Sequence, residues 1–536
     1  MRRKHSKIHV VGALFGSVIA SAAFAGDLNP PPGLIEPTMK TLDQVEPRIP
    51  LTQATAPGSA SGMFIIDEAG SYYLTEDLQG QNGVPGIRIQ ASGVTVDLNG
   101  FTLRGANGVD TASGIVVGVL PAPQDLTIRN GRVQGWTGDG ISINQFSRGA
   151  RIENVTVSNC DGNGFVTPQG STLINCVARN NDSDGFNVLG ESVLRGCTSV
   201  ENDGHGFVGG SSVTIEDCVA SENLLDGIKL GNSAVVRGCA TSQNQNGILV
   251  LGGSTVHGCS SDTDGLISGG GGASGINVGP GSVVTACSVR NVGGFEGGAT
   301  ESAAADPPSF VMARSFEAGV ARDGQPRWQP QFLGEIFTVG IFAEQSVVDG
   351  CSVDGANSTG FAVKGGTVLN SIARNSATGF RTLEGGTFKN CTATGNGTGF
   401  VFSGTSDGDW ATVGESCSAS ENGTGFVADR ALVLNCNATG NLLNGFVLFE
   451  FCTLRDGAAR LNDGDGVEVV GEDNVVDGMS IAFNGTGFGI SIESSSGFNL
   501  VVRNDLSFNS ISDMGGNTSQ IGPIDDLTSP WSNFQD

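Results

Sequence analysis

Three polar residues at equal spacing could form an acid–base site. Asp184, His205 and Asp226 each stand immediately before a glycine, and 21 residues separate each from the next. An imidazole between two carboxylates suits general acid–base catalysis, because the negative charges are expected to raise its pKa toward neutral pH. Lys229 follows Asp226 by three positions and would supply a cation. Asp184, His205, Asp226 and Lys229 are therefore the candidate catalytic residues.

The same stretch has two other interpretations. Asp182 and Asp203 stand two positions before Asp184 and His205. The carboxylates of Asp182, Asp184 and Asp203 could instead hold calcium, which takes oxygen ligands. Asp and Asn are also ordinary turn residues, because their side chains hydrogen-bond the nearby backbone. The sequence leaves a catalytic site, a calcium site and simple turn chemistry open.

A repeat of short strands must position these residues. Seventeen glycines between Gly86 and Gly487, each followed by Ile, Phe or Val, form a column of predicted coil starts, mostly at spacings of 19 to 28 residues. The unit shows no helical periodicity and consists of short β-rich runs separated by Gly, Ser, Asn and Asp. This pattern predicts an all-β solenoid, a single-stranded parallel β-helix of about 17 coils. At roughly 4.8 Å per coil, Asp184 and Asp226 would lie roughly 9.6 Å apart, near the carboxylate separation of inverting glycosidases.

The pentapeptide NGTGF marks one corner of the predicted coil. It occurs at Asn396–Phe400, Asn422–Phe426 and Asn484–Phe488. Asn and Gly tolerate a left-handed turn, the second Gly would open the next strand, and Phe would enter the core. We expect the same role for all three copies.

Cysteines and asparagines form two further columns. Seven cysteines each lie five residues before an asparagine: Cys176, Cys197, Cys218, Cys239, Cys391, Cys417 and Cys436. Cys259, Cys287 and Cys351 would extend that column, whereas Cys160 and Cys452 fall outside it. Stacked cysteines point the same way, which fits poorly with disulfide torsion angles. We therefore expect a stack of buried thiols rather than disulfides.

The chain divides into five segments by composition. Residues 1–25 read as a signal peptide, with a basic start, an apolar stretch and a small-residue cleavage site. Residues 26–62 read as a Pro-rich arm or linker. The β-helix would cover residues 63–510, with an insertion at about 293–339, and a C-terminal tail would cover 511–536. The signal predicts export to the periplasm, the cell surface or the extracellular space.

Net charge limits the partners. The chain carries 54 acidic and 28 basic residues, a net charge of −26. Removal of the signal peptide leaves 24 basic residues and a net charge of −30. Electrostatic repulsion then excludes general binding to nucleic acid, and no stretch beyond the signal has the length of a membrane span. The charge is compatible with calcium as a cofactor, with a neutral polymer as a ligand, or with solubility alone. Polysaccharide is a candidate partner, and we expect a monomer.

The opening DEAGSYYLTEDL, the following VTVDLNGFTLRG and the Gly-aromatic coils resemble an uncharacterised group of exported bacterial right-handed parallel β-helix repeat proteins. The likeness covers nearly everything after residue 63 and implies the fold of pectate and pectin lyases. Characterised relatives of that fold include polysaccharide lyases, hydrolases and epimerases, adhesins and phage tailspikes. Of the hydrolase signatures N-T-D, G-H-G and R-I-K, only Gly204–Gly206 is present, and D-P-H-D and R-x-P-x-x-R are absent.

Two functions follow from these observations. The first is a non-catalytic extracellular or surface protein that presents long strand faces to a polysaccharide or a protein partner. The alternative is a carbohydrate-active enzyme, a polysaccharide lyase or glycoside hydrolase, that uses Asp184, His205 and Asp226.

Overall fold

A computed structural model describes most of the chain between residues 48 and 535. The described residues are 48–106, 108, 111–118, 122–264, 273–293, 318–320, 326–328, 338–404, 412–493, 498–509, 514–516, 529 and 532–535. Residues 48–536 form one compact unit, separate from residues 1–47. The predicted signal peptide, part of the arm, most of the 293–339 insertion and most of the tail lie outside the described residues. Among the described residues no helix is long and apolar enough to cross a bilayer.

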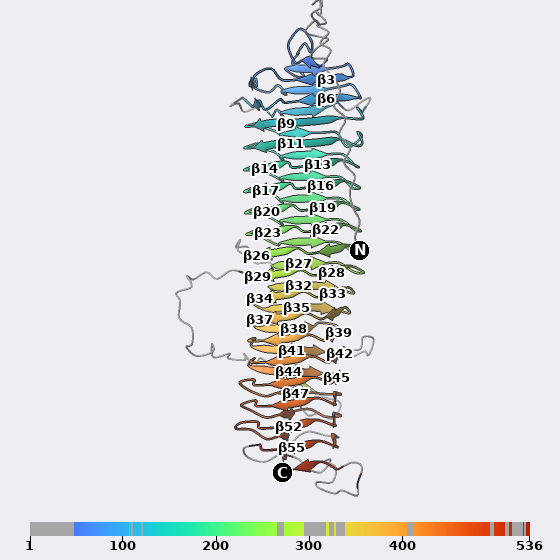
Figure 1. The fold of residues 1–536 in the computed structure, drawn as a ribbon, viewed down its shortest axis with the longest axis vertical. Coiled ribbons are helices and arrows are strands. Elements are labelled where there is room, and N and C mark those ends of the chain that lie inside the picture. The colour runs from blue at the N-terminus through green and yellow to red at the C-terminus, as the bar shows by residue number, and fades with distance from the viewer. Residues whose placement is uncertain are drawn as a thin grey trace, which may run out of the picture. The chain divides into compact units, whose positions relative to one another are not determined.

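The unit is a stack of β-coils, each contributing one strand to a 19-stranded parallel sheet (Figure 1). The strands of this sheet, in chain order, are β2 (Phe64–Ile66), β5 (Ile87–Ile89), β8 (Ile115–Val117), β10 (Ile141–Ser142), β12 (Phe165–Thr167), β15 (Phe186–Val188), β18 (Phe207–Gly209), β21 (Ile228–Leu230), β24 (Ile248–Val250), β27 (Ser274–Val278), β32 (Val339–Glu344), β35 (Thr359–Lys364), β38 (Thr378–Thr382), β41 (Thr398–Ser403), β44 (Thr424–Asp429), β47 (Phe446–Leu448), β50 (Val467–Val469), β53 (Ile490–Ile492) and β56 (Met514–Gly516).

The rest of each coil belongs to a 36-stranded sheet with two columns of strands. The first column contains β1 (Ile49–Pro50), β3 (Gly70–Tyr73), β6 (Val94–Asp97), β13 (Thr172–Ile174), β16 (Val193–Arg195), β19 (Thr214–Glu216), β22 (Val235–Arg237), β25 (Thr255–His257), β28 (Val283–Thr285), β33 (Val347–Asp349), β36 (Thr367–Leu369), β39 (Gly386–Lys389), β42 (Thr412–Glu415), β45 (Ala431–Leu434), β48 (Thr453–Arg455), β51 (Val475–Asp477) and β54 (Leu500–Val502). The second contains β4 (Leu78–Gln79), β7 (Thr102–Arg104), β14 (Val177–Arg179), β17 (Thr198–Val200), β20 (Val219–Ser221), β23 (Ala240–Ser242), β26 (Ser260–Asp262), β29 (Ser288–Arg290), β34 (Ser352–Asp354), β37 (Ile372–Arg374), β40 (Thr392–Thr394), β43 (Ser418–Ser420), β46 (Asn437–Thr439), β49 (Ala458–Arg460), β52 (Ser480–Ala482), β55 (Asp505–Ser507) and β57 (Phe534–Gln535). The strands β9 (Thr127–Gln134) and β11 (Arg151–Ser158) run through both columns, and a hairpin of β30 (Ala318–Val320) and β31 (Pro326–Trp328) is separate.

The structure confirms the predicted solenoid with two coils more than the seventeen glycine starts indicate. The additional coils begin with β2 and β56. The residue before Phe64 is Met63 and the residue before Met514 is Asp513, so neither coil has the opening glycine that marks the others. Residues 64–79 form the whole first coil, through β2, β3 and β4, and β1 pairs with β3 outside it.

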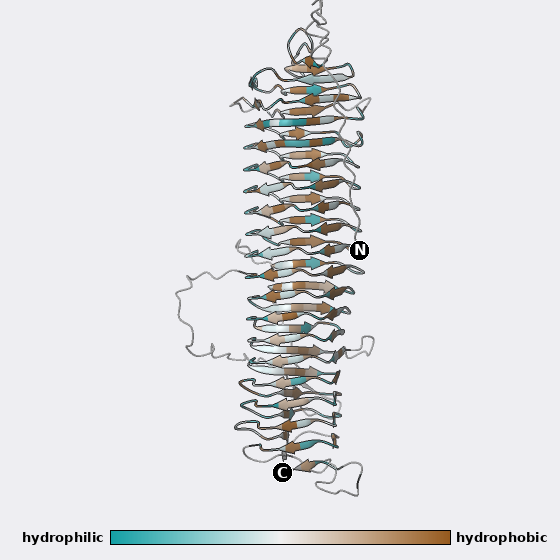
Figure 2. Ribbon diagram, in the orientation of Figure 1, coloured by the Kyte–Doolittle hydropathy of each residue, from teal (hydrophilic) through white to brown (hydrophobic). Residues whose placement is uncertain are grey.

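The core is filled by stacked apolar side chains. Strands of the 19-stranded sheet point their first and third residues inward, and Figure 2 shows the resulting hydrophobic strands lying coil upon coil. Phe165, Phe186 and Phe207 stack with ring centroids 4.7 and 4.8 Å apart. This matches the rise between neighbouring strands, so each ring contacts the next throughout the stack.

In two of the three NGTGF copies Phe enters the core as predicted, since Phe400 and Phe426 are fully buried. Their strands β41 and β44 begin at Thr398 and Thr424, one residue before the glycine expected to open them, and the left-handed residues are Gly395 and Glu421, directly before the Asn. In the third copy Phe488 is only partly buried, and β53 starts at Ile490 after Gly489. This turn has two more residues between its buried Asn484 and its opening glycine than the other copies, which moves the register past Phe488. The prediction for the third copy is therefore wrong.

All twelve cysteines are buried free thiols, as the stacking argument predicts. The backbone N–H of Cys197 donates to Sγ of Cys218 at 3.3 Å, and that of Cys351 donates to Ser371 Oγ at 3.2 Å. Cys160 lies instead in the asparagine column, where its N–H donates to Oδ1 of Asn181. Burial raises the pKa of the Cys160 thiol to about 11, so this thiol remains protonated and unreactive.

Candidate functional site

The register of three strands places the predicted residues in one column. Phe186 of β15 pairs with Phe207 of β18, and Phe207 pairs with Ile228 of β21. Asp184, His205 and Asp226 each stand two positions before these paired residues. They therefore stack on consecutive coils at one edge of the 19-stranded sheet, as the sequence predicts, and Lys229 points outward from β21 with 45% of its side chain exposed.

Hydrogen bonds show what this column does. The backbone N–H of His205 donates to Oδ1 of Asp184 at 2.8 Å, and the N–H of Asp226 donates to Nδ1 of His205 at 3.1 Å. The preceding coils repeat the arrangement. The backbone N–H of Asp184 donates to Oδ1 of Asn163, and the N–H of Asn163 donates to Oδ1 of Asp139. Each side chain thus accepts the N–H of the equivalent residue one coil later. Turn chemistry explains the choice of Asp, Asn and His in this column.

The contact at Nδ1 favours one tautomer of the imidazole. A ring nitrogen that accepts a hydrogen bond carries no proton, so the N–H of Asp226 favours neutral His205 with its hydrogen on Nε2. Burial lowers the pKa of His205, and Lys229 lowers it further, against the opposing charges of Asp226 and Asp184. The expectation that the two carboxylates raise this pKa is therefore wrong, because desolvation of the half-buried ring outweighs their attraction.

Asp226 anchors the outward-facing groups of the site. Its carboxylate is nearly buried, at 4% exposed. Its Oδ1 accepts a hydrogen bond from Nδ2 of Asn246 at 2.6 Å. Its Oδ2 lies 3.3 Å from Nδ1 of His205 and 3.7 Å from Nζ of Lys229. The Nζ of Lys229 and Nε2 of His205 are 3.5 Å apart. Two nitrogen donors therefore lie side by side on the sheet, and an oxygen acceptor placed over them could bond both.

The proposed calcium ligands do not converge. Asp182 and Asp203 are exposed, and Asp184 is engaged by the N–H of His205 and by Asn187 Nδ2 at 3.2 Å. Within the ranges that the structure describes, no group of three or more His, Cys, Asp or Glu side chains is arranged to hold a metal ion.

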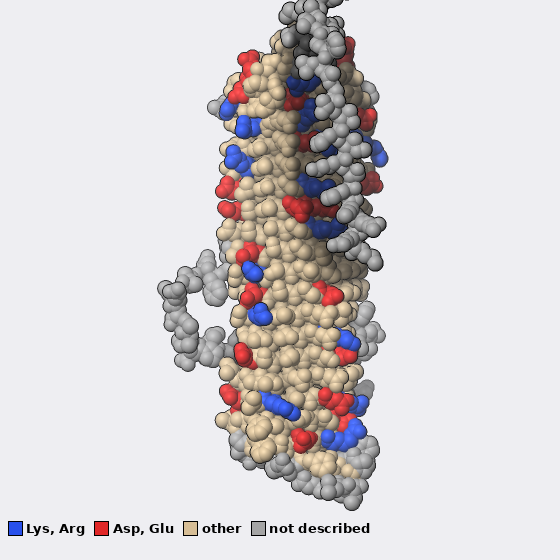
Figure 3. All heavy atoms as spheres, in the orientation of Figure 1, with Lys and Arg blue, Asp and Glu red and all other residues tan. Residues whose placement is uncertain are grey.

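The outward face of the 19-stranded sheet carries few charges. The central outward residues of its strands from β2 to β53 are Ile65, Arg88, Val116, Ser142, Val166, Asn187, Val208, Lys229, Leu249, Asn277, Phe342, Ala362, Arg381, Val401, Val427, Val447, Glu468 and Ser491. Only four of these are charged. In the view of Figure 3 charged side chains are scattered over the surface, with broad uncharged areas between them. A long polymer could lie on such a face without crossing strong charges.

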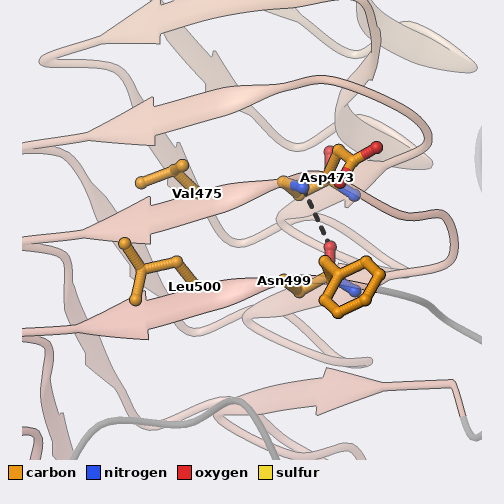
Figure 4. Close-up of a pocket in the computed structure, with 6 residues that line it drawn as sticks. Asp473, Val475, Asn499 and Leu500 are labelled. Atoms are coloured by element: carbon orange, nitrogen blue, oxygen red, sulfur yellow. Dashed lines mark hydrogen bonds between the residues drawn. The ribbon is translucent and has the colours of Figure 1, made fainter.

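A shallow pocket of about 320 Å³ lies far along the chain from the polar column (Figure 4). It is lined by Asp473, Asn474, Val475, Phe498, Asn499 and Leu500, and the N–H of Asn474 donates to Asn499 Oδ1 at 2.9 Å. It contains none of the predicted site residues. The sequence gives no separate signal for it, because Gly497 and Phe498 form the same Gly-Phe pair as the coil starts, although β54 of the 36-stranded sheet begins only at Leu500.

Comparisons with known proteins identify the fold. Residues 113–261 match the family model "Right handed beta helix region", and no curated protein matches the sequence. Among solved structures, the chain is similar to the Azotobacter vinelandii mannuronan C-5 epimerase AlgE4 A-module, at 13% identity over 87% of this chain and 91% of that one, with a TM-score of 0.26. It is also similar to the bacteriophage Phi29 gene product 12 N-terminal fragment, at 10% identity over 87% of both chains and a TM-score of 0.42.

A third similar structure is the tailspike of E. coli bacteriophage HK620, a mutant in complex with a pentasaccharide. It is 12% identical over 87% of this chain and 71% of that chain, with a TM-score of 0.32. At these identities and TM-scores the three structures carry no argument about this protein, and the fold rests on the family model and on the coils themselves. Together with the stacked parallel coils, the match over residues 113–261 makes this protein a right-handed parallel β-helix.

Proposed function

We propose that the protein is a non-catalytic binding protein that holds a neutral polysaccharide on the outward face of its 19-stranded sheet. The predicted signal peptide would export it, so that it meets its ligand outside the cytoplasm. His205 and Lys229 would donate hydrogen bonds to the ligand. The paired donors Nε2 and Nζ, 3.5 Å apart, are the observation that carries this proposal.

The paired donors favour an oxygen-rich ligand. Nδ1 of His205 is occupied by the N–H of Asp226, so Nε2–H must direct its hydrogen away from the corner. Lys229 Nζ beside it is also a donor, and neither group can satisfy the other. A sugar hydroxyl or ring oxygen would accept from both. The net charge of −26 disfavours an acidic polymer, which leaves neutral polysaccharide as the matching class.

The same geometry argues against catalysis. A general acid or base needs an atom free to exchange a proton with the substrate. Asp184 Oδ1 and His205 Nδ1 are engaged by backbone N–H groups, and Asp226 is nearly buried. Only Nε2 of a neutral imidazole and the amine of Lys229 face outward. These groups recognise oxygen well, but they do not form the pair of opposed carboxyl groups that glycoside hydrolysis uses.

The test separates binding from turnover. The mature protein would be run in native gels that contain neutral polysaccharides of the glucan, mannan and xylan classes, while released reducing ends and unsaturated uronates are measured. His205→Asn keeps a δ oxygen for the N–H of Asp226, as Asn163 and Asn246 do elsewhere in the column, but removes Nε2. Lys229→Met removes the second donor. Lys364→Met, on another strand of the same sheet, is the matched control.

We expect retarded migration with one or more neutral polysaccharides and no product. His205→Asn and Lys229→Met should each weaken binding about tenfold, the effect of roughly 1.4 kcal/mol, and Lys364→Met should not. Product that disappears in His205→Asn would show an enzyme instead. Binding that is equal in all four proteins would place the ligand elsewhere.

A further inference from the structure

An exposed apolar strip follows one corner of the last coils. Leu461, Phe483 and Phe508 are 59, 53 and 65% exposed. They occupy equivalent positions on consecutive coils, since β49, β52 and β55, whose ends they follow, are paired in register. The rings of Phe483 and Phe508 stack in parallel with centroids 5.0 Å apart. Leu442 and Leu443, also more than half exposed, lie in the corresponding turn of the preceding coil.

The backbone at this strip is unusual for such residues. Leu461, Phe483 and Phe508 have φ angles of 55, 57 and 54°. Large apolar residues rarely adopt this left-handed conformation, which favours Gly, Asn and Asp. Earlier coils place Asn159, Asn180, Glu201, Glu222, Gln243, Asn375 and Glu421 at the equivalent corner. Neither turn geometry nor core packing explains three exposed apolar side chains here, whereas a partner surface does.

We propose that this strip is the contact surface for a second copy of the chain. The side chains repeat at the spacing of the coils, and a surface with the same repeat is needed to match them over several coils. A second copy has that repeat. A two-fold axis at Phe483 would place Phe483 against its equivalent and Leu461 against Phe508, which is the self-complementary contact of a two-fold dimer.

The area available fits a weak dimer. A side chain of this size has on the order of 200 Å² of surface, so each of the five residues exposes roughly 100 Å². Burial of all five on both copies would remove roughly 1,000 Å², at the lower limit of specific interfaces. Each mature copy also carries a net charge of −30, from 24 basic and 54 acidic residues, and the two copies repel one another. Added salt screens this repulsion, so the association should strengthen as salt is raised.

Sedimentation velocity of the mature protein tests the dimer at several protein and salt concentrations. Phe483→Asn and the double variant Phe483→Asn/Phe508→Asn introduce the residue that the corner carries in other coils, so the fold should be retained. Phe451→Asn is the control. Phe451 is likewise exposed, at 55%, with a φ of 52°, but belongs to a different corner.

We expect a monomer–dimer equilibrium for the unaltered protein and for Phe451→Asn, tightened by salt. The single variant should dissociate at least tenfold more readily, and the double variant should be monomeric. A protein that is monomeric at every concentration, or that captures only a different molecule through this strip, would overturn the proposal. Equal dimerisation of all four proteins would overturn it as well.

Discussion

In two regions of the solenoid the backbone N–H groups at the same corner of the coil find different hydrogen-bond acceptors. From Asp139 to Asp226 the N–H before each opening glycine is accepted by a side chain of the previous coil, as in His205 N–H to Asp184 Oδ1. From residue 359 to residue 424 the equivalent N–H groups bond backbone carbonyls. The backbone N–H groups of Thr378, Thr398 and Thr424 donate to the carbonyl oxygens of Ser358, Ala377 and Gly397, respectively, at 2.8 to 3.0 Å.

The difference comes from the length of the turn, which is one residue longer in the first region than in the second. Three residues separate Asn181 from Gly185, but two separate Asn396 from Gly399. With the shorter turn the backbone stays in the hydrogen-bonded ladder between neighbouring strands, and β41 therefore extends over six residues where β15 has three. The longer turn takes one N–H out of the ladder, and a buried N–H must find another acceptor. Polar residues at such a corner therefore indicate a backbone requirement before they indicate a reaction.

The largest expected effect comes from breaking the core that both regions share. Phe400 is fully buried and its ring stacks on Phe380 and Phe426 at 4.8 Å. Phe400→Asp would bury an unpaired carboxylate, and we expect a loss of about 5 kcal/mol or more in the free energy of unfolding. Urea denaturation followed by circular dichroism measures it. Phe400→Leu should retain the fold, and a stable Phe400→Asp protein would contradict the stacked core.

The second prediction separates the two corners. Asp184→Ala leaves the N–H of His205 without its acceptor and should lower the free energy of unfolding by about 1–3 kcal/mol. Thr398→Ala leaves the backbone bond of its corner intact and should change it by less than about 0.5 kcal/mol. Asp184→Asn restores an acceptor and should be close to the unaltered protein. Equal losses in Asp184→Ala and Thr398→Ala would remove the distinction between the corners.

The sequence predicts most of this fold for a simple reason. Seventeen coils open with glycine before an apolar residue, because a side chain there would meet the backbone of the next coil. A Cβ on Gly185 would lie 2.8 Å from the carbonyl oxygen of Gly206. Coils that lack this glycine, at Phe64 and Met514, give no such signal. The thiol stack could be predicted because the cysteines share one spacing with the asparagines.

The sequence predicts where the candidate site lies, but it does not predict the hydrogen bonding or the pKa of His205. Spacing brings Asp184, His205 and Asp226 together and turns Lys229 outward. The spacing does not show that Nδ1 accepts a backbone N–H, and this bond with burial reverses the expected pKa shift. The apolar strip was missed because Phe483 and Phe508 look like core residues. Their signal is position, since each directly precedes the asparagine of its coil.

A third prediction concerns His205 itself. His205→Ala removes the neutral acceptor of the Asp226 N–H and should lower the free energy of unfolding by about 1–2 kcal/mol, less than Asp184→Ala because no charge is involved. The folded pKa of His205 is lowered, so the unfolded chain binds more protons between that pKa and about 6.5. Its contribution to stability is therefore lost as pH falls through this window. Between pH 8 and pH 5 the free energy of unfolding of the unaltered protein should fall relative to that of His205→Asn, which has no titrating group at this position, and a constant difference would contradict the shift.

The smallest expected effect lies between the two regions, at Asp264. This buried carboxylate ends one run of the asparagine column. It accepts hydrogen bonds from the N–H of Asn244 and from the hydroxyl groups of Thr241 and Ser261. Burial raises its pKa despite these bonds. The folded chain then holds this proton to a higher pH than the unfolded chain, so stability falls as pH rises above about 4 toward the raised pKa. Asp264→Asn should flatten that slope in denaturation curves, and an unchanged slope would contradict the shift.

The most direct test of the whole account is the ¹⁵N spectrum of the His205 side chain, assigned with His205→Asn and followed from pH 5 to 8 with and without a bound neutral oligosaccharide. We predict a neutral ring with its hydrogen on Nε2 at pH 7, a pKa below 6.5 and a resonance that moves when the oligosaccharide binds. A hydrogen on Nδ1, or titration at or above pH 7, would contradict the account and restore His205 as a candidate acid–base catalyst.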